Sequence, residues 1–193
     1  MKKKLTQPFE VLQEKQLLTI GMLFLLIFSF IAYYTNTRFD GVIDMHHSND
    51  VLIHQPLLDN IVNTLCLGVC VFILAYFVNK KTRWIDILAI TLICRIPLYF
   101  GALFNINNIS SDTGNYLIEN ISNPTAMLQL PTVNLIVLAL LTLYSLAALV
   151  FFAILLYKGF RTATNTKKLS QSLLLVPTVI VAEIISKALV YLY

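Results

Sequence analysis

Three charged side chains lie inside long apolar runs, where they are the residues best placed to do chemistry. Arg95 is part of "TLICRIPLYF", and Glu183 and Lys187 are part of "VAEIISKALV". The number of residues between Trp84 and Arg95 is the same as between Ser172 and Glu183. Each charged residue therefore lies roughly 16 Å along its helix from the start of the apolar run. An isolated charge at this depth costs at least about 2.5–3.5 kcal/mol. We therefore expect Arg95 and Glu183 to form an ion pair.

Lys187 follows Glu183 by one helical turn on the same face. We expect it to share the Glu183 carboxylate or to extend toward the outer surface, as long basic side chains do near helix ends. The intramembrane charge cluster of Arg95, Glu183 and Lys187 has two interpretations. It fixes which face of the third apolar run meets the fifth, or it lines a polar cavity for an ion, a proton or an anionic lipid group.

A second polar group follows the first apolar run, in "FDGVIDMHHSND". Neighbouring carboxylates and imidazoles can hold zinc or another divalent ion. The candidate ligands are Asp40, Asp44, His46 and His47. Their spacing does not match a metal motif such as H-E-x-x-H, and the alternative is a solvated acidic loop. Apart from this divalent metal we expect no cofactor, and we assign no catalytic residue.

The elements that position these residues are five apolar segments. The chain of 193 residues is 58% hydrophobic and 12% charged, with a mean hydropathy of +0.76, whereas a soluble domain has roughly 25% charged residues. A helix needs about 20 apolar residues to cross the bilayer. The sequence therefore predicts an all-α, polytopic membrane domain over residues 17–193, with spans at about 17–34, 57–78, 85–104, 132–157 and 173–193.

Lysine and arginine gather in alternate connections between these spans. They precede the first span, join the second to the third, and join the fourth to the fifth, whereas the other two loops hold only Arg38. The positive-inside rule places the basic side in the cytoplasm, with the amino terminus inside and Tyr193 outside. This topology accounts for a pI near 9.0. Nucleic-acid binding is not expected, because no segment offers a basic groove with interleaved aromatic residues.

The remaining segments are short. Residues 1–16 form an amphipathic cytoplasmic segment with Phe9 and Leu12 on one face, which suits either a short helix on the membrane surface or a frayed tail. The second outer loop, rich in Asn and Ser, is expected to be irregular with at most one helical turn. Pro97 and Pro177 should each interrupt a helix.

Four stretches resemble the bacterial branch of the Ypt-interacting protein (Yip) family: "QPFEVL", "TRFDGVIDMH", "RWIDILAITLICRIPLYF" and "LLYKGFRTATNTKK". The resemblance implies a five-span bundle with a cytoplasmic amino terminus, in a bacterial inner membrane. Eukaryotic members bind small GTPases and carry an Asp-Leu-Tyr-Gly-Pro motif. That motif is missing here, so GTPase binding is not carried over. The family-like positions are Asp40, Gly41, Asp44, His46, Asp86, Arg95 and Pro97.

We expect a non-enzymatic role, as a small scaffold or envelope-organising factor that acts through contacts with lipid, with itself or with another membrane protein. One alternative is a small permease or ion pathway that uses Arg95, Glu183 and Lys187, which needs a water-accessible cavity at the level of Arg95. Another is a metal-dependent membrane enzyme, which needs the Asp and His side chains of the first outer loop to converge. The scaffold predicts an apolar lateral groove or a homodimer face instead.

Overall fold

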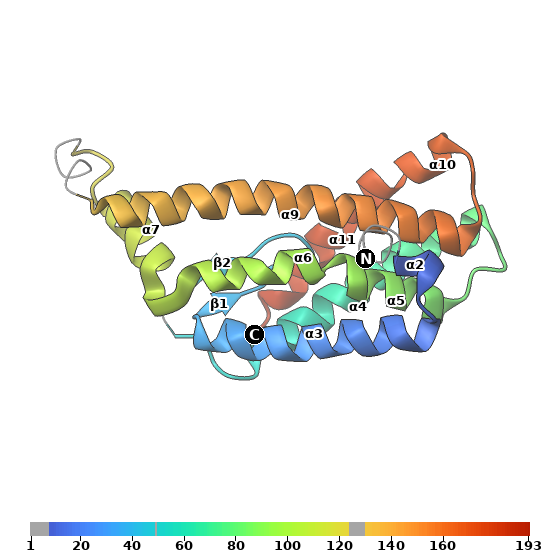
Figure 1. Ribbon diagram of the computed structural model, residues 1–193, viewed down its shortest axis with the longest axis horizontal. Coiled ribbons are helices and arrows are strands. Elements are labelled where there is room, and N and C mark those ends of the chain that lie inside the picture. The colour runs from blue at the N-terminus through green and yellow to red at the C-terminus, as the bar shows by residue number, and fades with distance from the viewer. Residues whose placement is uncertain (1–7, 49, 124–129) are drawn as a thin grey trace.

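The computed structural model describes residues 8–48, 50–123 and 130–193, and it is almost entirely helical. Five helical segments in this part of the chain are long and apolar enough to cross a membrane: Glu14–Tyr34, Gln55–Val78, Trp84–Glu119, Thr132–Thr164 and Leu169–Val190. They lie side by side along the long axis of the molecule (Figure 1). The five predicted spans are therefore confirmed as helices of spanning length, and their boundaries agree best for the first two.

The segments are built from the following elements. The first is α3 (Glu14–Tyr34), preceded by α2 (Pro8–Val11), and the second is α4 (Gln55–Val78). The third joins α5 (Trp84–Cys94), α6 (Ile96–Tyr99), the 3₁₀ helix η1 (Phe100–Asn108) and α7 (Ile109–Glu119). The fourth is α9 (Thr132–Thr164), and the fifth joins α10 (Leu169–Leu173) and α11 (Leu175–Val190). Two short strands, β1 (Thr37–Arg38) and β2 (His46–His47), pair in antiparallel register between α3 and α4.

Both prolines interrupt their helices as expected. α5 ends just before Arg95 and α6 begins just after it, while the fifth segment breaks at Leu174, between α10 and α11. Each break lies near the residue four positions before the proline, whose carbonyl cannot accept the usual helical hydrogen bond. The second outer loop differs from the expectation of irregular chain. Its first half forms η1 and α7, and residues 124–129 lie outside the described part.

The described helices pack around three apolar clusters, of which two are larger. One lies between α4, α5, α9 and α11, with Leu67, Ile87 and Phe160 at its centre. The other joins α3, α5 and α6 to the chain between α3 and α4. There the Phe28 ring stacks on Tyr99, and the Phe39 ring packs edge-on against it. The second core matters for function, because it draws the first outer loop into the bundle.

The predicted amino-terminal helix is short and packs on the protein. α2 spans only Pro8–Val11, and Phe9 lies against Gly159 of α9 and Ile90 of α5. At this end of the bundle Arg83 forms ion pairs with Glu14 of α3 and with Asp86 of α5. Residues 1–7, which hold three of the predicted cytoplasmic lysines, lie outside the described part of the chain.

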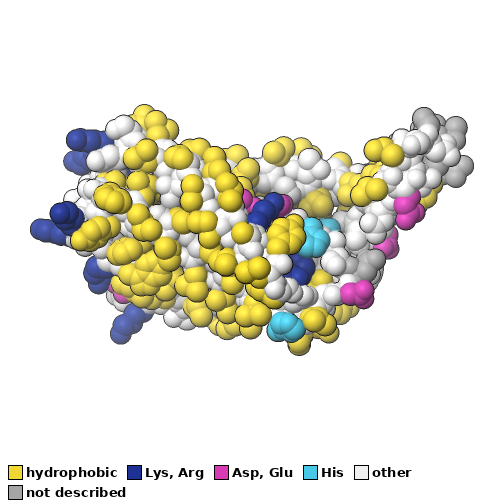
Figure 2. Space-filling model, turned by 180° about the vertical axis from the view of Figure 1, so that it is seen from behind, with side chains coloured by type: hydrophobic (Ala, Val, Ile, Leu, Met, Phe, Trp, Pro, Cys, Tyr) yellow, Lys and Arg dark blue, Asp and Glu magenta, His cyan; other side chains and the backbone are white. Residues whose placement is uncertain are grey.

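Lys and Arg side chains gather at one end of the molecule, and apolar side chains cover the surface between the ends (Figure 2). The same view shows acidic, basic and His side chains together around a hollow away from the basic end.

Candidate functional site: a loop inside the bundle and a lateral groove

The predicted first outer loop, residues 35–48 and 50–54 between α3 and α4, enters the helix bundle instead of lying over it. Phe39 and Val42 are buried, and Asn63 of α4 donates to the Phe39 carbonyl at 2.7 Å. Non-helical backbone is tolerated at membrane depth only where protein or a water-filled cavity satisfies its polar groups. Here the polar side chains of α4 and Arg95 supply the partners.

Arg95 is buried, with 1% of its surface exposed, and neutral groups surround it. Its guanidinium donates to the Asn60 carbonyl at 3.0 Å, to Thr64 Oγ1 at 2.9 Å, to Asn60 Oδ1 at 3.3 Å and to the Val42 carbonyl at 3.3 Å. The Tyr99 ring lies 5.2 Å from the guanidinium carbon, close enough for a cation–π contact. The break between α5 and α6 puts Arg95 at this crossing of three elements.

The expected ion pair between Arg95 and Glu183 is wrong, because the outer loop lies between them. Arg95 Nε donates to the Val42 carbonyl, and the N–H of the same peptide unit, that of Ile43, donates to Glu183 Oε2 at 3.0 Å. The C=O and N–H of a trans peptide point in opposite directions. One peptide unit therefore bridges the two charges, with the guanidinium on one side and the carboxylate on the other.

Gly41 makes room for this arrangement. A Cβ atom at this position would lie 2.2 Å from Glu183 Oε1, far inside van der Waals contact. The family-like glycine is thus the surface against which the Glu183 carboxylate packs. This role needs no unusual backbone conformation, because no described glycine has a positive φ.

Lys187 does both things that the sequence allowed. Its Nζ lies 3.8 Å from Glu183 Oε1, and it pairs with Asp44 Oδ2 of the outer loop at 2.5 Å. Lys187 and Asp44 are both partly exposed, so this pair forms the solvent-facing edge of the cluster. Two charged residues of α11 therefore clamp the loop at Gly41, Ile43 and Asp44.

The four candidate metal ligands do not converge. Asp40 pairs with His46 at 2.5 Å, Asp44 pairs with Lys187, and His47 Nδ1 lies 3.0 Å from Thr37 Oγ1. Over residues 8–48, 50–123 and 130–193, no group of three His, Cys, Asp or Glu side chains is placed to hold a metal ion. The strand pairing explains this, since it turns His46 and His47 to different partners.

The histidines sit in opposite environments. The hydrogen bond that the His46 imidazolium donates to the Asp40 carboxylate raises the pKa of His46, and the charge of Asp40 acts in the same direction. Burial lowers the pKa of His47 to about 4, and the neighbouring His46 adds to this. At neutral pH His47 is therefore an uncharged imidazole beside the cavity described below.

A second buried pair holds the same loop. Arg38 binds Asp59 of α4 through two hydrogen bonds of 2.8 Å, and the Tyr193 hydroxyl donates to the same carboxylate at 3.2 Å. Sequence reasoning missed this group and the role of Asn60. The available signal was the polar stripe on the second span, where Asp59, Asn60, Asn63 and Thr64 share one face.

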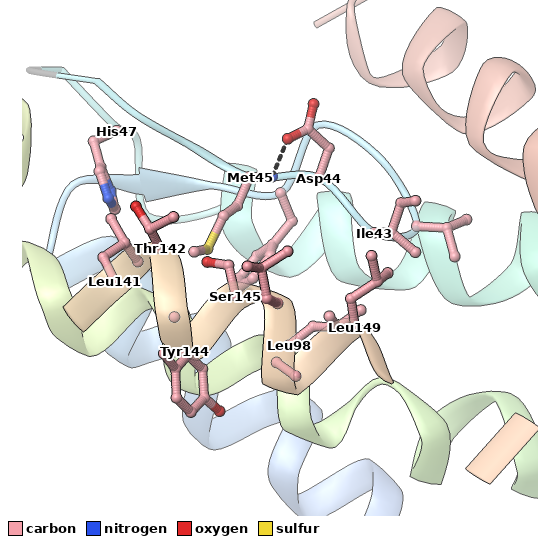
Figure 3. A pocket seen from close by; sticks show the side chains of 15 residues that line it. Ile43, Asp44, Met45, His47, Leu98, Leu141, Thr142, Tyr144, Ser145 and Leu149 are labelled. Carbon is pink, nitrogen blue, oxygen red and sulfur yellow. Dashed lines mark hydrogen bonds between the residues drawn. The ribbon is translucent and has the colours of Figure 1, made fainter. Parts of the chain in front are cut away.

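Two hollows flank the clamped loop. The loop cavity, of about 480 Å³, lies between the loop, the α6–η1 region and α9 (Figure 3). It is lined by Phe39, Val42, Ile43, Asp44, Met45, His47, Leu98, Gly101, Leu141, Thr142, Tyr144, Ser145, Leu146, Ala148 and Leu149. The lateral groove, of about 330 Å³, lies between α9 and the α10–α11 segment and is almost wholly apolar. The two hollows share Ile43 and Leu149.

The core beneath the loop is closed. Asn60, Asn63, Thr64, Tyr99 and Arg95 are all buried, and none of them lines either hollow. Arg95 thus lines neither hollow, and its guanidinium is enclosed by Asn60, Thr64 and the Val42 carbonyl. The openings of this site face sideways, along α9.

Comparison of the chain with family models, with curated proteins and with solved structures gave no match.

Proposed function

We propose that this protein is a non-enzymatic membrane-organising factor that holds lipid in the lateral groove between α9 and α11. The observation that carries the proposal is the groove itself, a hollow of about 330 Å³ lined by apolar side chains of both helices. Ligand sites are concave, mostly apolar and carry few polar groups. The lining side chains come from one face of α9 and one face of α11, so a chain-like ligand can run along both.

The closed core supports this proposal over a permease. A pathway that uses Arg95 needs room for water or an ion beside the guanidinium, whereas Asn60, Thr64 and Val42 occupy its donors. Arg95 has the contacts of a packing residue that anchors the loop. Glu183 and Lys187 likewise hold the loop against α11.

The location belongs to the same proposal. The Yip-like motifs favour a bacterial inner membrane, and the basic end of the molecule favours an orientation with that end in the cytoplasm. The Asp and Lys side chains around the loop then face the other side. The large apolar side chains exposed on α3 and α4 leave room for a second copy or another membrane protein.

Native mass spectrometry of the purified protein tests lipid retention. We expect a lipid adduct that survives detergent purification and that is lost in Leu149→Trp, because the indole fills the junction shared by the two hollows. Val150→Trp is the matched control, since its neighbouring position is exposed and lines neither hollow. Equal adducts in both variants would contradict the proposal, as would protein-dependent ion flux in vesicles that disappears in Arg95→Leu.

A further inference from the structure

The loop cavity is lined by four uncharged polar side chains, one of which, Tyr144, already donates its hydroxyl to the Pro97 carbonyl at 2.6 Å. The other three, His47, Thr142 and Ser145, lie around the cavity, whereas the Asp44 carboxylate points away from it (Figure 3). Asp44 is held by the Met45 N–H at 2.9 Å and by Lys187. His47 is neutral at physiological pH, because burial lowers its pKa to about 4. A charged ligand would therefore meet no counter-charge in this space.

The hydrogen bonds already made show what a ligand must offer. The Thr142 hydroxyl donates to the Leu138 carbonyl at 2.9 Å, so its oxygen is left as an acceptor. His47 Nδ1 is bonded to Thr37 Oγ1 at 3.0 Å, and no described residue bonds Nε2. In the tautomer that carries its proton on Nδ1, Nε2 is an acceptor. Ser145 is bonded to none of the described residues and can donate. The cavity is suited to a ligand with both a hydroxyl and an acceptor oxygen.

The depth of the cavity favours an uncharged head group. Ser145 lies 13 residues from Lys158 at the basic end of α9, roughly 20 Å along the helix. The hydrocarbon layer is about 30 Å thick, so Ser145 lies about 10 Å below the far boundary. A phosphate at this level would lose its hydration without gaining a cation, because Arg95 and Lys187 are already bound.

The lateral groove continues from this head site. It shares Ile43 and Leu149 with the loop cavity and extends along α9 to Tyr157, about 18 Å from Ser145. One leaflet of hydrocarbon is about 15 Å thick, half of the layer. The groove itself covers about 12 Å of α9, from Leu149 to Tyr157, so the two hollows together accommodate most of one acyl chain attached to a head in the loop cavity.

We propose that the loop cavity binds the glycerol head of an uncharged glycerolipid, a diacylglycerol, with one of its acyl chains in the lateral groove. The free glycerol hydroxyl donates to His47 Nε2 or Thr142, and an ester carbonyl accepts from Ser145. This inference rests on the proposed function and names the lipid that the groove holds.

The test uses the full chain in nanodiscs with three photoactivatable probes that share one diazirine acyl chain: a diacylglycerol, a phosphatidylcholine and a phosphatidic acid. We expect the diacylglycerol to label residues 141–157 of α9 about fivefold more than either phospholipid, the effect of about one hydrogen bond or more. Ser145→Ala should reduce that labelling about fivefold, and Ser145→Thr should keep it. Thr178→Ala, on a face of α11 that lines neither hollow, is the control and should change nothing.

The outcomes separate this inference from the proposed function. Equal labelling by all three probes that Leu149→Trp blocks and Val150→Trp does not would overturn head-group recognition and leave lipid binding in the groove intact. Labelling by the diacylglycerol that is unchanged in Ser145→Ala would also overturn the head-group assignment. No labelling of 141–157 by any probe would overturn both.

Discussion

At the scale of single residues, Arg95 shows how a buried charge can be satisfied without a charged partner. Its four hydrogen bonds go to two carbonyls, one amide and one hydroxyl, with an aromatic ring beside it. Neutral acceptors in a low-dielectric interior bind a cation more strongly than they would in water. The pairing with Glu183 was predicted from depth alone, and depth fixes only one coordinate of a helical residue. Hydropathy does not show in which direction a side chain points, and it does not show that a loop lies between two helices.

Arg95 should be coupled energetically to Asn60 more strongly than to Glu183. Arg95→Leu leaves several buried acceptors without a donor, at roughly 1–3 kcal/mol for each group left unpaired. In a double-mutant cycle with Asn60→Leu we expect a coupling of about 0.5–3 kcal/mol, the range for residues in contact. The measurement is the free energy of unfolding in mixed micelles. A cycle with Glu183→Leu is the comparison, and a larger coupling there would contradict the peptide bridge.

The neighbouring histidines should respond to pH with opposite signs. The raised pKa of His46, caused first by its hydrogen bond to Asp40, stabilises the fold below pH 6.5, and this contribution is lost as pH rises through the raised value. His47 is buried as a neutral group, so its contribution is present above pH 6.5 and is lost as pH falls toward about 4. Arg38 and Asp59 also face His46, with smaller opposing effects.

Melting temperatures at pH 5 and pH 8 check this. His46→Gln should lower the melting temperature, relative to the unsubstituted protein, more at pH 5 than at pH 8. His47→Gln should lower it more at pH 8 than at pH 5. Deficits that do not change with pH, or that change in the same direction, would mean that the two rings are not held in these protonation states.

At the scale of elements, the outer loop and α11 fit each other through Gly41, Ile43 and Asp44. The apolar lengths predicted the helices well, because the thickness of the bilayer sets a length that every span must meet. Pro97 and Pro177 predicted the breaks, because a missing N–H acts locally. The path of the loop was not predictable in the same way. Its polar composition suggested a solvated surface, and only the polar stripe of α4 shows that the bundle has partners for it.

Gly41→Ala should loosen this fit. The new methyl group would lie 2.2 Å from Glu183 Oε1, so the flexible carboxylate end must move away and lose the hydrogen bond from the Ile43 N–H, at about 0.5–1.5 kcal/mol. In a Glu183→Ala background the carboxylate is gone and the added cost should largely disappear. Gly114→Ala is the matched control, because nothing lies within 4 Å of a Cβ there. Thermal unfolding is measured for the unsubstituted protein, the two single variants, the double variant and the control. A cost for Gly41→Ala that persists without Glu183 would show that the loop does not pack against α11 at this point.

At the scale of the whole molecule, the bundle is closed along its axis and open to the side. Asn60 and Thr64 of α4, with Tyr99 of α6, close the core around Arg95, and the loop cavity and the lateral groove lie along α9. This arrangement is consistent with the lipid site that we propose. The scaffold interpretation of the sequence included such a groove, but apolar composition could not place it, because lipid-facing and groove-facing side chains on α9 are equally apolar.

The most direct test of this account is the accessibility of a spin label at Leu149, in a background with Cys66, Cys70 and Cys94 replaced by alanine, in reconstituted vesicles. Leu149 lines both hollows, and Val150 is the lipid-facing reference. The account predicts frequent collisions with oxygen, which concentrates in lipid, and few with a water-soluble nickel complex, as at Val150. Frequent collisions with the nickel complex at Leu149 would show a water-filled passage and contradict it.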